Sequence, residues 1–147
     1  MPRLARPEEA ATLRALVREA YAHYVPRMGR EPAPMTDDYA ARIAAGEAWI
    51  EEAEGTPVGV LVLEESEGGL LLDNIAVAPA ALGKGYGKLL LQFAEAEAMR
   101  RGYTRIHLYT NEKMVENIAL YTRIGYVETH RARQAGHNRV FMEKRLA

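Results

Sequence analysis

The sequence predicts an α+β domain with a mixed sheet of about seven strands and about four helices. Three observations predict it. Apolar residues recur at helical spacing near the start of the chain, three strand-like segments follow at close spacing, and helices then alternate with strands. A chain of 147 residues has the length of one domain, which we expect to span residues 1–147.

Local signals set the expected limits of the helices. Pro7 suits the first turn of a helix whose apolar positions continue to Tyr24, and the prolines within residues 26–34 should break regular structure after it. Thr36 can cap a second helix that Gly46 can end. A third helix begins directly after a glycine-rich loop and ends near Arg101, and a fourth spans Val115–Ile124.

The expected strands are marked by apolar residues between turn signals. Residues 70–77 are almost wholly apolar, as is typical of a central strand that is buried on both faces. The tetrapeptide Glu54-Gly-Thr-Pro57 is typical of a hairpin turn between two earlier strands. The other expected strands lie around Leu4 and at residues 48–53, 58–65, 104–109, 126–133 and 139–145.

Composition narrows the class of protein. The absence of cysteine excludes disulfides, thiolate metal sites and a cysteine nucleophile, and His23, His130 and His137 lack metal-ligand spacing, so we expect no metal. Lys and Arg number 19 against 20 Asp and Glu, which gives no electrostatic case for nucleic acid. Apolar runs are too short to span a bilayer, and the N-terminus has no apolar signal core. We therefore expect a cytoplasmic protein with no membrane or nucleic-acid partner.

The strongest functional signal lies in residues 73–91. There an apolar strand runs into a turn, glycines alternate at Gly83, Gly85 and Gly87 with lysines beside them, and a helix begins. Glycines allow a ligand to approach the backbone closely, and the unpaired N–H groups at a helix N-terminus attract anions. The segment therefore predicts a seat for a phosphate or pyrophosphate.

Two common phosphate loops do not fit the spacing of these glycines. The Rossmann fingerprint G-x-G-x-x-G needs its third glycine one residue later, and the expected acidic residue about 20 positions on is missing. The Walker loop G-x-x-x-x-G-K-[ST] needs one more residue between glycines, and Leu89 stands where its hydroxyl should be.

The glycine loop, its place after the fourth strand and the later segment Asn117-Ile-Ala-Leu-Tyr121-Thr-Arg-Ile-Gly-Tyr126 together resemble the GNAT superfamily of N-acetyltransferases. The element order is similar along nearly the whole chain, which implies the GNAT acyl-CoA N-acyltransferase fold, an α/β/α sandwich-like arrangement. The family's loop pattern, (Arg/Gln)-x-x-G-x-(G/A), is matched by residues 82–87. Leu82 departs from it, which puts a side-chain contact from that position in doubt.

The resemblance implies that acetyl-CoA is the co-substrate and that its acetyl group moves to a primary amine of a small molecule by direct attack. The pantetheine arm would pair with the backbone of the fourth strand at Ile75, Ala76 and Val77. Asn117, on the later helix, can also contact the cofactor. The implied pyrophosphate seat comprises Gly83, Lys84, Gly85, Tyr86, Gly87 and Lys88.

The resemblance also implies the catalytic residues. Tyr121 matches the tyrosine that protonates the leaving CoA thiolate, although its spacing from apolar neighbours also fits a simple core residue. The general base is Asp73, His107 or a water chain, and Asp73 is slightly favoured. Asp73 shares strand parity with Ile75 and Val77, which would place it beside the thioester.

The acceptor is expected to lie against the first two helices, their connecting loop and the last hairpin. Arg27 and Arg30 are candidates to hold a carboxylate of the acceptor. A peptide N-terminus or lysine is an alternative acceptor, and an acyl-CoA sensor or a small interaction module is an alternative function. An exposed strand edge leaves a homodimer open. The candidate acceptor-lining side chains are Tyr21, Tyr24, Met28, Tyr39 and Trp49.

Overall fold

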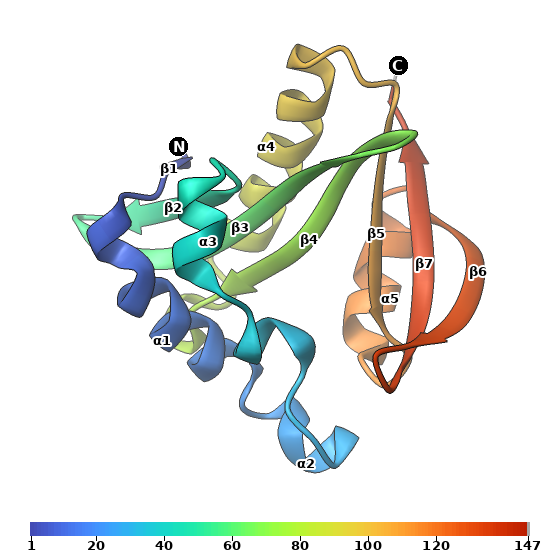
Figure 1. Cartoon of the computed structure of the whole chain (residues 1–147), viewed down its shortest axis with the longest axis horizontal. Helices are drawn as coiled ribbons and strands as arrows, with labels where there is room; N and C mark the ends of the chain where they lie inside the picture. Colours follow the sequence, from blue (N-terminus) through green and yellow to red (C-terminus); the bar gives the residue numbers. More distant parts are fainter. Residues whose placement is uncertain (147) are drawn as a thin grey trace.

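The computed structural model describes residues 1–146, and its core is one seven-stranded sheet (Figure 1). Ala147, the last residue of the expected domain, lies outside the described residues. The strand order is β1-β2-β3-β4-β5-β7-β6, in which β4 and β5 pair parallel and the other five neighbouring pairs are antiparallel. The strands are β1 Arg3–Leu4, β2 Ala48–Ala53, β3 Thr56–Ser66, β4 Gly69–Val77, β5 Arg105–Asn111, β6 Val127–Gln134 and β7 His137–Arg145. The α+β class and the mixed sheet are confirmed.

Five α-helices accompany the sheet, one more than the sequence predicts. None of them, within residues 1–146, combines the length and apolar character needed to cross a membrane. Short 3₁₀ turns occupy Pro7–Glu9, Ala33–Thr36 and Pro79–Ala81. The helices are α1 Ala10–Tyr21, α2 Tyr24–Met28, α3 Tyr39–Ala44, α4 Tyr86–Arg100 and α5 Val115–Arg123.

The extra helix, α2, corrects the prediction that regular structure breaks at Pro26. Pro26 stands in the first turn of α2, where a backbone N–H would have no partner within the helix, so the proline costs no hydrogen bond there. The predicted cap of the next helix is also wrong. Asp38 caps α3, because its Oδ1 accepts the Ala41 N–H at 3.1 Å, whereas Thr36 belongs to the preceding 3₁₀ turn.

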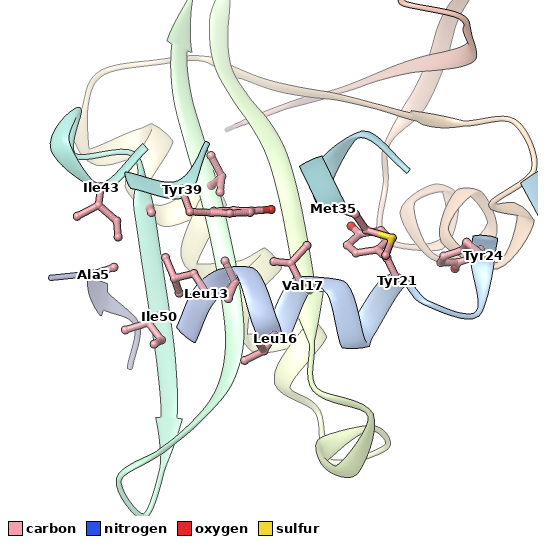
Figure 2. Close-up of a cluster of buried hydrophobic side chains, with 14 of the residues drawn as sticks. Ala5, Leu13, Leu16, Val17, Tyr21, Tyr24, Met35, Tyr39, Ile43 and Ile50 are labelled. Carbon is pink, nitrogen blue, oxygen red and sulfur yellow. The ribbon is translucent and has the colours of Figure 1, made fainter. Parts of the chain in front are cut away.

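The core has two parts, one on each face of the sheet. On one face α1 and α3 pack against β2, β3 and β4, and Leu13, Val17 and Ile50 are among the fully buried side chains there (Figure 2). On the other face α4 packs against β3, β4 and β5, and α5 lies against β6. The central strands β3 and β4 contribute side chains to both parts, which is why their sequences are apolar almost throughout.

A β-bulge interrupts β4 at Asp73. Val62 of β3 lies opposite Asn74, and the next β3 residue, Leu63, lies opposite Leu72, so Asp73 is the additional residue. The bulge changes the side-chain alternation: Leu72 points to the α4 face, whereas Asp73 and Asn74 both bond residues on the α1 and α3 side. The bulge therefore corrects the prediction that Asp73 shares a face with Ile75 and Val77.

The sheet divides after the bulge. β4 and β5 pair only between residues 70–72 and 106–108, and the two strands diverge beyond this point (Figure 1). The C-terminal half of β4 therefore loses its neighbour on one edge while it still pairs with β3 on the other. This open edge positions the candidate site, because it leaves main-chain N–H and C=O groups of β4 without a strand partner.

Candidate functional site

Two cavities open along the gap between β4 and β5. We call the first the loop cavity: it has a volume of about 460 Å³ and is bounded by the end of β4, the glycine loop, the last turn of α1 and α5. We call the second the charged cavity: it has a volume of about 290 Å³ and lies between β4, β5, β7 and the segment from α2 to α3. The two cavities meet, and the residues that line both are Tyr21, Ile75, Asn117 and Tyr121.

The glycine loop shapes one end of the loop cavity. Gly83 and Gly85 adopt φ values of 80° and 85°, which side-chain-bearing residues resist, and Gly85 is the N-cap of α4. Apart from its chain neighbours and the backbone of its own helix, a Cβ added at Gly83, Gly85 or Gly87 would meet no atom of residues 1–146 within 4 Å. The glycines are therefore not required by packing within the chain, and their bare backbone faces open space beside a helix N-terminus, as a phosphate seat requires.

The wall of the loop cavity fits an extended, mostly apolar ligand that ends in phosphates. Ala76 and Val77 lie on the open edge of β4, and Leu91 and Leu120 supply apolar contacts from α4 and α5. Lys84 and Lys88 are exposed and flank the loop without lining the cavity. Leu82 does line it and is 64% exposed, so its apolar side chain stands at the mouth of the cavity.

Tyr121 and Asn117 stand where the cavities join. Tyr121 belongs to the core on the α4 face of the sheet, and it also lines both cavities. Its position is therefore compatible with a role in the core and with a role in the site. Its hydroxyl makes no hydrogen bond within residues 1–146, and burial raises its pKa well above the ordinary value of a tyrosine. Asn117 lies one turn earlier on α5 and is half-buried, with its amide 3.8 Å from the sulfur of Met114.

Asp73 projects into the charged cavity from the bulge of β4. Its side chain is 10% exposed, and its oxygens accept hydrogen bonds from Arg42 Nη2 at 3.1 Å and from the Tyr109 hydroxyl at 2.9 Å. Burial raises the pKa of Asp73 above its ordinary value, and this effect is larger than the lowering of the pKa by Arg42 and Tyr109. A carboxylate with a raised pKa beside a cavity is a candidate proton acceptor.

Arg42 fixes Asp73 as part of a larger cluster. Its guanidinium also pairs with Asp37 at 2.9 Å, with Glu47 at 3.1 Å and with Glu64 at 3.4 Å. Because four carboxylates surround one arginine, the positive charge of Arg42 is fully compensated within the protein. Of these carboxylates, Asp37 and Asp73 line the charged cavity together with Arg42, so this side of the cavity carries a net negative charge.

The structure does not bring the other candidate base to the site. His107 lies in the paired part of β5, where its Nε2 is 2.6 Å from the Ser66 hydroxyl, and it lines neither cavity. Burial, together with nearby Arg105, lowers its pKa. Its contacts are those of a residue that stabilises the β3–β4 turn, since Ser66 also donates to the Gly69 carbonyl at 2.9 Å.

The candidate acceptor residues divide between cavity and core. Tyr21 and Met28 line the charged cavity, and Tyr24 lines the loop cavity. Tyr39 is fully buried beneath α1, and Trp49 packs edge-on against Phe93, so neither reaches the site.

Two arginines expected to bind the acceptor instead connect the segments around the two cavities. Arg27 of α2 pairs with Glu116 of α5 at 2.6 Å, and Arg30 donates to the Gly136 carbonyl at 3.0 Å. Neither arginine lines a cavity. These contacts connect the N-terminal helices to α5 and to the β6–β7 hairpin, which limits the space between them.

Sequence reasoning missed several residues of the charged cavity. Tyr109 and Asn111 alternate on one face of β5, and Arg139 lies on the same face of β7 opposite Asn111. Tyr109 and Arg139 stand at the ends of two expected strands, and Asn111 lies beyond the expected end of the first, so their positions did not tell which residues meet a cavity. Asp37, from the segment before α3, and His137 of β7 also line the charged cavity. No pattern in the sequence marked either residue as part of a site.

A buried hydrogen-bond chain holds the junction in place. The Tyr21 hydroxyl contacts Asn74 Oδ1 at 2.8 Å and the Ile75 carbonyl at 2.9 Å, and Asn74 Nδ2 donates to the Tyr39 hydroxyl at 3.1 Å. Tyr39 in turn donates to the Pro34 carbonyl. The chain links α1, β4, α3 and the turn before α3, and the Tyr21 hydroxyl ties the Ile75 carbonyl to it.

Comparisons with known proteins agree with this geometry. A family model described as the acetyltransferase (GNAT) family matches residues 11–126. The uncharacterized N-acetyltransferase YjgM of Escherichia coli is 35% identical over 82 residues, which cover 53% of this chain and 49% of that protein. The mycothiol acetyltransferase of Jonesia denitrificans is 37% identical over 57 residues, which cover 39% of this chain and 18% of that protein. The chain thus matches about half or less of the length of these curated relatives.

A solved structure extends the likeness to the whole fold. The PaiA N-acetyltransferase of Thermoplasma acidophilum, crystallised in complex with coenzyme A, superposes with a TM-score of 0.82 over 99% of this chain and 98% of that one, at 19% identity. At this identity the match concerns the fold alone. Since the family model covers most of the sequence, the chain belongs to the GNAT acetyltransferase family.

Proposed function

We propose that the protein is an acetyl-CoA-dependent N-acetyltransferase that moves the acetyl group to a primary amine of a small molecule by direct attack. The observation that carries this proposal is the junction of the two cavities at Ile75 and Tyr121. One cavity suits the donor, and the other holds a buried carboxylate, Asp73, suited to an amine.

The donor is assigned to the loop cavity. Its pyrophosphate would lie on the backbone of residues 83–88, and its pantetheine arm would pair with Ile75, Ala76 and Val77 along the open edge of β4. The bare glycine backbone, the flanking Lys84 and Lys88 and the apolar wall support this placement. The same N–H groups of β4 are candidates to stabilise the oxyanion that forms on the thioester.

The acceptor amine is assigned to the charged cavity. A free primary amine has a pKa near about 10.4 and arrives as an ammonium ion, which the negative β4 side attracts. Asp73 takes its proton, directly or through a water molecule, so that the nitrogen lone pair can attack the thioester carbon. The C–N bond forms and the C–S bond breaks at the junction, and the second proton that the nitrogen then loses replaces the proton that the thiolate receives.

The leaving sulfur is assigned to Tyr121. A thiol has a pKa near about 8.5, below that of a tyrosine, so Tyr121 keeps its proton at neutral pH and can donate it, or a hydrogen bond, as charge builds on sulfur. The free hydroxyl of Tyr121 at the junction supports this role. Asn117, one helical turn away, would contact the cofactor near the same point.

A small acceptor fits the dimensions of the charged cavity. Its volume of about 290 Å³ lies at the lower end of ligand pockets, and the contacts of Arg27 and Arg30 restrict its surroundings. A peptide N-terminus would have to pass these contacts.

The direct test is turnover. Purified protein is incubated with acetyl-CoA and a panel of primary amines that includes small molecules and short peptides, and release of free CoA is followed with a thiol reagent. We expect release to depend on a small amine. Tight binding of acetyl-CoA without release for any amine would identify a sensor instead, and preferential use of peptides would reassign the acceptor class. Failure of acetyl-CoA to raise the melting temperature would favour a structural role for the loop.

A further inference from the structure

Arg139 is a cation of the charged cavity that no carboxylate balances within residues 1–146. It lies half-buried on β7, and its Nη1 donates to the Gln134 side-chain oxygen at 3.1 Å. Its guanidinium stands 4.2 Å from the centre of the Tyr109 ring. Arg42, the other arginine of the cavity, has four carboxylate partners, so the two cations of this cavity differ in whether their charge is available to a ligand.

Arg139 and Asp73 line the same cavity, and both contact Tyr109. The Tyr109 hydroxyl donates to Asp73 Oδ1 at 2.9 Å, while its ring lies beneath the Arg139 guanidinium. One tyrosine side chain therefore separates a buried carboxylate from an uncompensated guanidinium. The cavity is negative beside β4 and positive beside β7.

The remaining titratable groups around Arg139 do not cancel this arrangement. His137 also lines the cavity, and burial together with Arg30 and Arg139 lowers its pKa, so it is neutral at physiological pH. Asn111 lies 3.4 Å from the His137 ring nitrogen and carries no charge. Asp37, the other carboxylate of the cavity, is bound by Arg42 at 2.9 Å.

We propose that the acceptor carries a carboxylate as well as its primary amine, as an amino acid does, with the amine at Asp73 and the carboxylate on Arg139. This inference rests on the proposed N-acetyltransferase function and names its substrate class. A guanidinium binds a carboxylate through two parallel hydrogen bonds, which fixes orientation as well as position. Two fixed ends would direct the amine toward the junction at Tyr121.

The arrangement predicts discrimination against neutral analogues. An acceptor whose carboxylate is replaced by a carboxamide would leave Arg139 partly desolvated without an anion. Sites built to bond a polar group reject analogues that lack it, and we expect a loss of about tenfold or more in kcat/KM for the amide.

The test compares amino acids with their own amides. The full-length protein is assayed by CoA release with α-, β- and ω-amino acids, each paired with its carboxamide, and the acid-to-amide ratio of kcat/KM is measured. We expect the best acid to exceed its amide by about tenfold or more, Arg139→Gln to lower this ratio by about tenfold or more, and Arg139→Lys to retain part of the preference. Arg133→Gln, which removes an exposed arginine of β6 outside both cavities, should keep the original ratio.

The outcomes separate the two proposals. Comparing ratios between variants cancels the lower basicity of an amide's amine, and a merely structural loss in Arg139→Gln would lower both rates together. Equal use of acids and amides by the unmodified protein, or an unchanged ratio in Arg139→Gln, overturns this inference and leaves the N-acetyltransferase proposal intact. No turnover of any amine overturns both.

Discussion

The loop cavity takes much of its wall from one stretch of chain, residues 75–91, whereas the charged cavity collects its wall from four separate segments. The loop cavity offers mainly backbone and apolar surface. The charged cavity offers the side chains of Asp73, Tyr109 and Arg139. A site built from contiguous backbone depends little on side-chain identity, which suits a donor common to a family. A site built from scattered side chains can change with each substitution, which suits an acceptor that varies.

The largest expected effect tests the junction between the cavities. Tyr121→Phe removes the hydroxyl proposed to protonate sulfur, so kcat should fall by about 10²–10³-fold, while the Kd for acetyl-CoA changes little. Steady-state CoA release and a binding titration measure the two quantities.

Tyr126 supplies the matched control for this variant. Its ring lies 5.8 Å from that of Tyr121, and its buried hydroxyl has no partner within residues 1–146, but it lines neither cavity. Tyr126→Phe should leave kcat unchanged and should not lower the melting temperature, because it removes an unsatisfied polar group. Equal losses in the two variants would mean that Tyr121 acts only as a core residue.

The next effect concerns the charged cavity alone. Asp73→Asn should lower kcat/KM for amines by about 10²-fold, because the amide cannot accept the proton of the ammonium ion. Binding of acetyl-CoA should be unchanged, since Asp73 does not line the loop cavity. A variant that retains full activity would exclude Asp73 as the base.

The same variant should reveal a pH-dependent stability difference. The pKa of Asp73 in the folded chain lies above its ordinary value of 3.8, so the folded state holds this proton to higher pH than the unfolded state does. The stability that the proton contributes is therefore present at low pH and is lost as pH rises through the raised pKa. Melting curves should show Asp73→Asn gaining stability relative to the unmodified protein as pH rises from about 4 to neutrality. A constant difference across that range would contradict the raised pKa.

The smallest effect concerns the loop cavity. Gly85 and Gly102 share a φ of 85°, and within the described part of the chain an added Cβ at either would meet no atom within 4 Å beyond its chain neighbours. Alanine at either position should cost a similar stability of about 1 kcal/mol, because both must adopt the left-handed conformation. Only Gly85→Ala should also raise the Kd for CoA, by about tenfold, since its methyl group projects beside the phosphate seat. Equal CoA affinity in both variants would remove the loop from the binding site.

Most of the fold, and the glycine loop to which we assign the donor, followed from local patterns in the sequence. Glycines at 83, 85 and 87 before a helix, and an apolar run at residues 70–77, have direct physical meanings that do not depend on distant residues. The helix through Pro26 was missed because a proline in a first turn gives the same local signal as a helix end.

The acceptor side depended on tertiary structure for a different reason. The bulge at Asp73 changed the face on which this residue lies, and a single extra residue in a strand leaves no signature in apolar spacing. Arg27 and Arg30 were expected to hold a carboxylate of the acceptor. In the structure Arg27 forms an ion pair with Glu116, and Arg30 donates a hydrogen bond to the Gly136 carbonyl. The sequence analysis did not identify Arg139, which lies over the Tyr109 ring, as a site residue.

The sequence by itself determined the α+β class, the order of most elements and the position of a glycine loop at a helix N-terminus, because each depends on residues close together in the chain. Only the tertiary structure decided which charges meet in the second cavity. Pairing in space depends on strand register, on the divergence of β4 from β5 and on which arginine already has a partner. The physical reason is that backbone preferences are local, whereas the compensation of charge is set by neighbours that the fold alone brings together.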